Sequence, residues 1–347
     1  MEMIEYGSDF YTCDIVYCPL SNSFKDMGDV RFYASGRHAI DAIVYQEGWK
    51  RMWVPAYFCY EVIQHIRLLG IEIIFYNDHP LRKDDDLLVR SLPYQEGDVL
   101  LRMNFFGLRS KRSNEGIPVS VVEDHSHALL SSWALNSDAD WCIASVRKSF
   151  PVAIGGILWS PLKMKLPSQI EPTDSCNQLV GIRYEAMQMK RKYLETNGEK
   201  IDKDSFREKY IQTEEMLDKL PLSGMDKESK DIFLKADYKR WTDLRTANWE
   251  IATNILDKRF SILKSLDEDW SPFSIIFVCN SDDERMALRQ HLIQNRIYPA
   301  ILWKVPEDSC FSDALDFSNR MLSVHCDARY NRQQIEEMCS LINKYYD

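Results

Sequence analysis

The chain has 347 residues, of which 45% are hydrophobic and 12% aromatic, so it is long enough to bury a large core and to form two domains. Its formal net charge of −10 at pH 7 opposes binding to nucleic acid or to an anionic membrane, and neither is expected as a partner. The chain has nine cysteines and no Cys-x-x-Cys pair, which predicts reduced thiols. Its first residues lack the basic and apolar pattern of a signal peptide, so a cytoplasmic protein is expected.

Helical and strand-like segments alternate over the first two-thirds of the chain, which is the pattern of a parallel sheet covered by helices. Residues 35–45 predict a helix that begins after a Ser-Gly pair, and residues 58–69 predict a second helix that ends at Gly70. Short apolar segments predict strands at residues 52–54, 71–76, 99–103, 119–122, 141–146 and 156–159. This order predicts an α/β fold with a doubly wound sheet.

The last third of the chain begins with charged helical segments and then alternates again. Helices are predicted over residues 178–220 and 227–263, and the cationic run at residues 190–192 is interpreted as part of a solvated face, like the acidic run at residues 84–86. Further strands are predicted at residues 273–279, 298–303 and 321–325, and further helices at residues 282–294 and 331–346. This alternation predicts a smaller C-terminal α/β domain, residues 236–347, after a large domain, residues 1–235.

An acid and a lysine follow two successive predicted strands. Asp124 lies in the stretch E-D-H-S-H at residues 123–127, and Lys148 follows the next strand, ahead of the glycine pair at residues 155–156. Ligands of parallel sheets bind at the carboxyl ends of the strands. A lysine that condenses with an aldehyde, and an acid that keeps a ring nitrogen protonated, suit pyridoxal phosphate (PLP). The Ser-Gly-Arg turn at residues 35–37, before a helix, suits the phosphate of that cofactor.

Other kinds of site have less support in the sequence. His125 and His127 leave a metal site with Asp124 as an alternative, although no third ligand at a familiar spacing accompanies them. The patterns G-x-G-x-x-G, G-x-x-x-x-G-K-[ST] and H-E-x-x-H are absent, which argues against dinucleotide, nucleotide triphosphate and zinc-protease enzymes.

Several stretches resemble, in order, the motifs of the DegT/DnrJ/EryC1/StrS family of PLP-dependent sugar aminotransferases. The strongest match is Lys148 with the glycine pair that begins seven residues later, which resembles the T-K-N-x-x-x-G-x-G-G element of that family. The others are S-G-R-H-A-I at residues 35–40, V-P-A-Y-F at 54–58, E-D-H-S-H at 123–127 and M-L-S-V-H at 321–325, the last followed by a C-terminal helix. The likeness spans most of residues 30–346.

This resemblance implies a fold-type-I, aspartate aminotransferase-like architecture and a homodimer with sites at the subunit interface. It implies that Lys148 carries PLP covalently and shuttles protons, and that Asp124 contacts the ring nitrogen. The further cofactor contacts that it implies are Ser35, Gly36, Arg37, Tyr57, Phe58, His127 and Ser145. The implied reaction transfers an amino group, with glutamate as donor, to a keto sugar on a nucleotide carrier, in polysaccharide or secondary-metabolite sugar biosynthesis.

The sequence also departs from the motifs of the family. His127 replaces a glutamine that contacts the phenolic oxygen of the cofactor, Arg37 replaces a threonine, and Ser145 lies three rather than five residues before Lys148. The G-Y-N-Y-R segment, by which the partner subunit reaches the phosphate, is echoed only by G-I-R-Y at residues 181–184. A non-catalytic or regulatory relative is therefore an alternative, and so is another PLP reaction such as dehydration.

Overall fold

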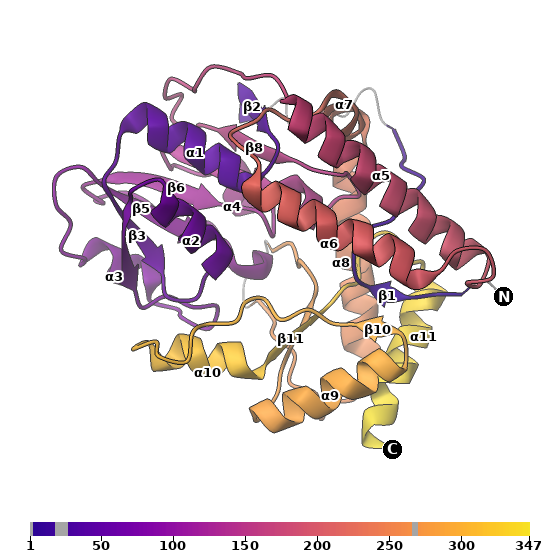
Figure 1. The fold of residues 1–347 in the computed structure, drawn as a ribbon. Helices are drawn as coiled ribbons and strands as arrows, with labels where there is room; N and C mark the ends of the chain where they lie inside the picture. The colour runs from indigo at the N-terminus through magenta and orange to yellow at the C-terminus, as the bar shows by residue number, and fades with distance from the viewer. Residues whose placement is uncertain (1–2, 18–26, 266–269) are drawn as a thin grey trace.

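A seven-stranded sheet forms the centre of the computed structural model, which describes residues 3–17, 27–265 and 270–347 (Figure 1). In spatial order its strands are β2 (Val30–Tyr33), β8 (Gly156–Trp159), β7 (Trp141–Ser145), β6 (Ser120–Asp124), β5 (Asp98–Met103), β3 (Arg51–Pro55) and β4 (Glu72–Tyr76). β8 runs antiparallel to both of its neighbours, and the other pairs are parallel. The carboxyl ends of β3, β5, β6 and β7 therefore meet at one edge of the sheet, as predicted.

Helices cover both faces of this sheet (Figure 1). Their bounds are α1 (Gly36–Glu47), α2 (Tyr60–Leu68), α3 (Asp85–Arg90), α4 (Ser132–Leu135), α5 (Asp174–Glu195), α6 (Lys203–Lys219), α7 (Lys227–Lys235), α8 (Tyr238–Ile255), α9 (Asp282–Gln294), α10 (Ser312–Arg320) and α11 (Arg332–Asn343). Leu101 of β5 packs in one core with Ile43 of α1 and Ile63 of α2, whereas Leu100 packs in a second core with Trp241 of α8. Because successive side chains of a strand point to opposite faces, strands covered on both faces read as continuous apolar runs.

Local signals fix where the first helices begin and end. Ser35 caps α1, with its Oγ accepting a hydrogen bond from the amide of His38 at 3.3 Å. Gly48 ends this helix with a φ of 68°, and Gly70 follows α2 with a φ of 79°. Both glycines take the left-handed conformation that ends many helices. The predictions for these two helices are confirmed to within the usual uncertainty at helix ends.

The C-terminal part is built on a two-stranded antiparallel sheet of β9 (Ile275–Val278) and β11 (Met321–Val324). A third core joins this sheet to α8, α9 and α11 through residues such as Trp249 and Ile335. Figure 1 shows α8 running from the main sheet to these elements, so Trp241 at one end and Trp249 further along lie in different cores. α10 contacts α9 and β9, and its Phe317 also belongs to the core that contains residues of α1 and α2.

Most predicted elements are confirmed, and β8 and α9 have the predicted bounds. The strand predicted at residues 298–303 is wrong, because only β10 (Ile297–Tyr298) forms there, paired with β1 (Tyr6–Gly7). β1, β2, α3, α4 and α10 were not predicted, since short segments give too few apolar positions to set a period. The division at residue 235 stays a prediction, and it falls between the end of α7 and the start of α8. No helix in the described ranges has the length and apolar character needed to cross a membrane.

The two charged runs that were placed in solvent each contain a buried side chain. Lys190 of α5 is 1% exposed, and its Nζ donates to the carbonyl of Asp9 at 2.6 Å and to Oγ of Ser8 at 3.2 Å. Burial lowers the pKa of Lys190 to about 8. Asp85 of α3 is also 1% exposed. The prediction of a solvent-exposed side chain was therefore wrong for Lys190 and for Asp85. A charged side chain can be buried where polar or oppositely charged groups from other parts of the chain contact it.

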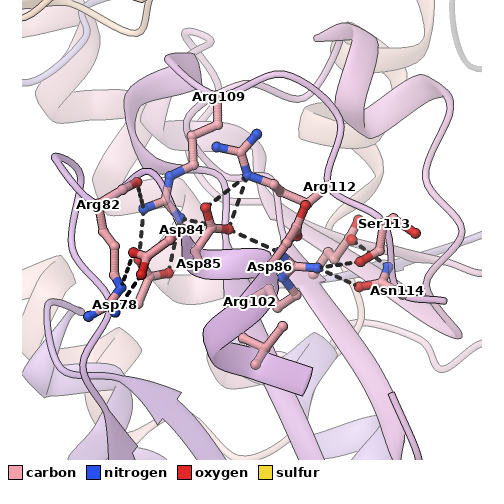
Figure 2. A network of polar contacts seen from close by, with 12 residues as sticks. Asp78, Arg82, Asp84, Asp85, Asp86, Arg102, Arg109, Arg112, Ser113 and Asn114 are labelled. Carbon is pink, nitrogen blue, oxygen red and sulfur yellow. Dashed lines mark hydrogen bonds and ion pairs between the residues drawn. The ribbon is translucent and has the colours of Figure 1, made fainter. Parts of the chain in front are cut away.

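Asp85 is the centre of a buried ion network. Figure 2 shows Arg102, Arg109 and Arg112 around its carboxylate, with nitrogen–oxygen distances of 3.0, 3.5 and 3.0 Å. Burial alone would raise the pKa of Asp85, but the three guanidinium groups lower it below its ordinary value. Arg109 also donates to both carboxylate oxygens of Asp78, at 3.0 and 2.7 Å. The network therefore ties α3 and the end of β4 to the segment that follows β5.

Candidate active site

A cavity of about 410 Å³ opens at the carboxyl ends of the central strands. Its wall includes His127, which follows β6, and Lys148 in η3 (Val146–Lys148), the turn after β7. Phe273 and His325, from the C-terminal part of the chain, contribute to the same wall. Two residues predicted for the site, Lys148 and His127, thus share one cavity, and its volume is in the range that holds small ligands.

The turn that carries Lys148 is supported by α8. Oγ of Ser149 lies 2.6 Å from the hydroxyl of Tyr238, and the carbonyl of Ser149 accepts a hydrogen bond from Nε1 of Trp241 at 2.9 Å. The amine of Lys148 lies over the indole ring of Trp303, with Nζ 5.3 Å from the ring centre. A cation over an indole face is a favourable contact, so Trp303 orients the amine.

Two glycines bring the start of α1 close to this turn. A Cβ on Gly156 would lie 2.1 Å from the carbonyl carbon of Ser35, and a Cβ on Gly36 would lie 3.5 Å from Cβ of Ser145. The first amides of a helix have no partner within the helix, and the positive end of its dipole attracts anions. The structure therefore brings Ser35, Gly36 and Ser145 together, near the turn of Lys148, in an arrangement suited to an anion.

None of the other predicted contacts is among the residues that line the cavity, and three of them have partners elsewhere in the chain. Arg37 forms an ion pair of 2.7 Å with Asp218 of α6. Tyr57 and Phe58 are buried against Trp303, and the centre of each ring lies 5.8 Å from that of the indole. The hydroxyl of Tyr57 donates a hydrogen bond to the carbonyl of Leu302. Sequence analysis missed Trp303, because it appeared only as the last residue of a predicted strand.

Asp124 lies at the end of β6 and is 6% exposed. Its Oδ1 accepts a hydrogen bond from the amide of Ser126 at 2.8 Å, and Oγ of Ser126 accepts one from the amide of Ser145 at 2.8 Å. Asp124 is thus joined through one residue to the strand end that leads to Lys148. Within the described ranges no hydrogen bond engages Oδ2 of Asp124, and Asp124 is not among the residues that line the cavity.

His127 is fully buried between aromatic rings. Its ring centre lies 4.4 Å from that of Phe273 and 5.1 Å from that of Trp303, with both rings stacked on it. Nδ1 accepts a hydrogen bond of 3.3 Å from the amide of Phe106, whereas Nε2 has no partner among the residues that the structure describes. Burial, followed by the charges of Lys148 and Arg245, lowers the pKa of His127 well below its ordinary value. The imidazole is therefore neutral.

The ion network of Figure 2 supports the segment that contacts His127. The guanidinium of Arg109 lies 4.8 Å from the ring centre of Phe105, while its nitrogens bind Asp78. Phe106 follows directly and has a φ of 53°, in the left-handed region that a bulky residue rarely adopts. Buried ion pairs and packing thus hold this backbone where its amide meets His127.

The metal site considered from the sequence is not the arrangement found. In the described part of the chain, the potential metal ligands that lie together are Glu123, His125 and Cys142, without Asp124 or His127. Glu123 accepts hydrogen bonds from Nε2 of His125 at 3.1 Å and from Oγ of Ser137 at 2.6 Å. These side chains use one another as partners, so the cluster is a closed hydrogen-bond network.

Two arginines at the cavity wall are paired with acids of the same chain. Arg147 binds both carboxylate oxygens of Glu214 at 2.9 Å. Arg183 binds Glu214 at 2.7 Å and Asp9 at 3.1 Å. The G-I-R-Y segment at residues 181–184, which echoes the family segment that reaches the partner subunit, lies in α5. Its arginine, Arg183, is paired with acids of its own chain. Burial alone would raise the pKa of Glu214, but the two guanidinium groups lower it.

Solved structures, among them one of a sugar aminotransferase, resemble this chain over nearly its whole length. A protein of Streptococcus pneumoniae described as a sugar aminotransferase, in its PLP form, is 14% identical, with a TM-score of 0.62 over 95% of this chain and 92% of that one. The Helicobacter pylori aminotransferase PseC, involved in pseudoaminic acid biosynthesis, is 12% identical, with a TM-score of 0.64 over 99% of both chains. DesI, solved in the presence of its TDP-sugar product, is 12% identical, with a TM-score of 0.61 over 91% of this chain and 80% of that one.

The chain has the fold of these aminotransferases. The predicted fold class, a mostly parallel sheet wrapped by helices with a smaller C-terminal part, is therefore confirmed. No family model matches the sequence, and no curated protein matches it either. At these identities the likeness is one of fold, so the chemistry has to be argued from the residues of the site.

Proposed function

We propose that this protein is a PLP-dependent aminotransferase of the DegT/DnrJ/EryC1/StrS type, with Lys148 as the residue that holds the cofactor. The observation that carries the proposal is the position of Lys148 at the end of β7, in one cavity with the unpaired Nε2 of His127 and next to the start of α1. PLP needs an amine for its aldehyde, a hydrogen-bond donor for its phenolic oxygen and an anion-binding site for its phosphate.

The residues present fit this cofactor. The amide of Phe106 occupies Nδ1 of His127, so the neutral ring carries its proton on Nε2 and offers a donor to a phenolic oxygen. The start of α1, where glycine at position 36 allows a close approach to Ser145, suits a phosphate. Oδ2 of Asp124 is left for a protonated ring nitrogen. When bound, PLP supplies an aldehyde that takes up an amino group and a ring that accepts electrons.

The chain's own side chains would then divide the work. Lys148 would take and return the proton at the substrate carbon, since this residue lines the cavity. Asp124 keeps the ring nitrogen protonated from the end of β6. His127, neutral and locked between Phe273 and Trp303, donates without gaining a proton, and these apolar rings exclude water from that side.

For the substrates we propose glutamate as amino donor and a keto sugar on a nucleotide carrier as acceptor. The structures named above support this choice, because one is described as a sugar aminotransferase, one as an aminotransferase of pseudoaminic acid biosynthesis, and one was solved in the presence of its TDP-sugar product. We also propose a cytoplasmic homodimer, as the resemblance implies. Light scattering in dilute solution checks the assembly, and a monodisperse monomer with full activity would contradict it.

One observation favours a second function, a non-catalytic relative that keeps the fold. The amine of Lys148 rests on the indole of Trp303, and Arg37 is already paired with Asp218, so both groups have partners within the chain. In such a relative the cavity would bind no PLP.

The visible spectrum of the purified protein, with PLP and then with L-glutamate, separates these two functions. An aminotransferase shows a yellow absorbance that bleaches when glutamate is added, whereas a scaffold shows neither change. Borohydride reduction followed by peptide mass spectrometry then locates the cofactor. We expect the adduct on Lys148, its loss in Lys148→Ala, and its retention in the control Lys192→Ala, an exposed lysine of α5. An adduct on another peptide would overturn the assignment.

A further inference from the structure

A segment near the N-terminus forms part of the cavity wall. Ser8, Asp9 and Phe10 line the cavity together with Lys148 and His127. These three residues lie outside residues 30–346, where the sequence resembles the aminotransferase motifs, so the resemblance gives them no role. A few well-placed polar groups give a ligand cavity its specificity. Polar residues of this segment are therefore candidates for a role that is particular to this chain.

The backbone turns sharply to reach the cavity. Gly7 has a φ of 84° and Ser8 a φ of 62°, both in the left-handed region. A Cβ on Gly7 would lie 2.4 Å from the carbonyl oxygen of Tyr298, a residue that also lines the cavity. Only glycine allows such a close approach of two backbones. This turn directs the residues that follow it, Ser8 and Asp9, to the wall.

The buried ammonium group of Lys190 holds the segment in this position. Its Nζ donates to the carbonyl of Asp9 at 2.6 Å and to Oγ of Ser8 at 3.2 Å. Nη1 of Arg329 donates to the same carbonyl of Asp9 at 3.3 Å. Because one cation comes from α5 and the other from the segment after β11, the backbone of Asp9 is fixed by two separate parts of the fold.

The carboxylate of Asp9 is engaged on one side only. Oδ1 lies 3.1 Å from Nη2 of Arg183, whereas no hydrogen bond or ion pair engages Oδ2 anywhere in residues 3–17, 27–265 and 270–347. The side chain is 42% exposed, so a molecule in the cavity can reach it. An ionised carboxylate only accepts hydrogen bonds. A ligand group that meets Oδ2 must therefore be a donor.

The charges around Asp9 favour a neutral donor. Arg147 and Arg183 are both paired with Glu214, and Arg183 is paired with Asp9 as well, so both cations are compensated. A carboxylate or phosphate at Oδ2 would meet a like charge, which is unfavourable. A hydroxyl group donates to a carboxylate without bringing charge, and hydroxyl groups are the donors that a keto sugar offers.

We propose that Asp9 is a specificity-determining residue that accepts a hydrogen bond from a hydroxyl group of the keto acceptor. The inference rests on the proposed function, because the acceptor must enter the cavity that Lys148 lines. Lys190 is a positioning residue in this arrangement, since it acts through the backbone of Asp9 and the side chain of Ser8. The protein should then prefer a hydroxylated ketone to a ketone of the same carbon skeleton without hydroxyl groups.

Two ketones with one carbon skeleton test this inference. L-Erythrulose is 2-butanone with a hydroxyl group on each of its other carbons. L-Glutamate first bleaches the PLP-loaded full-length protein, and the return of the yellow absorbance with each ketone then gives a rate constant. The ratio of the two constants, L-erythrulose over 2-butanone, is the quantity compared, because a change in overall activity cancels in it.

The variants are Asp9→Ala, Asp9→Asn and the control Asp14→Ala. Asp14 belongs to the same segment and is also paired with an arginine of α5, Arg191. Its side chain is 91% exposed, and it is not among the residues that line the cavity. The control therefore removes a carboxylate and an ion pair from the segment without changing the cavity.

We expect the ratio to fall about tenfold in Asp9→Ala, the usual effect of losing one hydrogen bond to a charged group. It should fall less in Asp9→Asn, which keeps an accepting oxygen, and Asp14→Ala should equal the parent. An unchanged ratio in Asp9→Ala, no preference for L-erythrulose in the parent, or an equal fall in Asp14→Ala would each overturn the proposal.

Lys190→Met tests the positioning role, because methionine fills similar space without the ammonium group. We expect it to lower the same ratio while the rate constant with 2-butanone stays within about twofold of the parent. Lys190→Arg keeps the charge and should restore part of the preference. If Lys190→Met lowered both rate constants alike, Lys190 would be a structural residue only, and its positioning role would be overturned.

Failure of the proposed function would give a different result. In that case the parent would form no borohydride adduct and would not bleach with glutamate. Saturation-transfer NMR with L-erythrulose, on the parent and on Asp9→Ala, needs no cofactor chemistry and still decides the role of Asp9. Weaker transfer in Asp9→Ala than in the parent would support a hydroxyl contact, and equal transfer would overturn it.

Discussion

The amide of Phe106 donates a hydrogen bond to Nδ1 of His127, and this one contact sets the tautomer of a ring that lines the cavity. Since the amide occupies Nδ1, the proton of the neutral imidazole lies on Nε2. Because burial keeps the ring neutral, His127 acts as a fixed donor and not as an acid or base. The glutamine of the family motif would offer a donor at the same place.

From this we expect His127→Gln to keep PLP and His127→Phe to weaken it. The phenylalanine fills the space between Phe273 and Trp303 but removes the donor, which should cost about 1.5–3 kcal/mol, or roughly 10- to 100-fold in affinity. Fluorescence titration with PLP measures the two constants. Equal affinities in both variants would show that Nε2 does not meet the cofactor.

Asp124→Asn should separate binding of the cofactor from its chemistry. The asparagine keeps an oxygen for the amide of Ser126 but cannot hold a proton on the ring nitrogen by charge. We expect the borohydride adduct on Lys148 to survive while transamination falls by about 100- to 1,000-fold, the usual effect of removing a preorganised electrostatic contact. The two measurements are mass spectrometry and the rate of keto-acid formation from glutamate. Full activity in this variant would remove Asp124 from the site.

Arg109→Ala should destabilise the protein strongly, because it leaves the buried Asp78 without its ion-pair partner and removes one of the three guanidinium groups around Asp85. Breaking a buried ion pair on one side costs about 3–5 kcal/mol. The matched control is Arg207→Ala, whose ion pair with Asp204 is exposed and should contribute no more than about 1 kcal/mol. Urea denaturation measures both changes. A small change in Arg109→Ala would mean that the network in Figure 2 is dispensable for stability.

Stability should fall as the pH is lowered from 7 towards 4, partly because of His325. Burial, opposed by the charge of Asp327, lowers the pKa of His325 to about 4. An unfolded histidine takes up a proton near pH 6.5, so between these values the unfolded chain binds a proton that the folded chain does not. The free energy of unfolding then falls by up to about 1.4 kcal/mol per pH unit for this group.

The variant His325→Gln isolates that contribution, since glutamine does not titrate. We expect its free energy of unfolding to fall less steeply than that of the parent between pH 6.5 and 4.5. Other histidines with lowered pKa values, such as His38 and His79, contribute equally to both proteins. Identical slopes for parent and variant would show that His325 does not titrate differently on folding.

The sequence predicted the parallel sheet and the shared position of Lys148 and His127, because strand ends are marked by apolar runs followed by polar residues. Trp303 could not be predicted in the same way. It lies in a segment whose local pattern gives no chemical signal, and it reaches Lys148 and His127 only because the C-terminal part packs against the main sheet. The burial of Asp85 was missed for a similar reason, since its three arginines come from a distant segment.

α8 and α10 have a consequence for the way this protein unfolds. Trp241 and Trp249 anchor one helix in two cores, and Phe317 of α10 completes the core beneath α1 and α2. If the chain were cut after residue 235, the apolar groups around Phe106 would face water, because the residues that cover them lie beyond the cut. The two parts of the chain should thus melt in a single cooperative transition, and neither fragment should hold its native state when expressed alone.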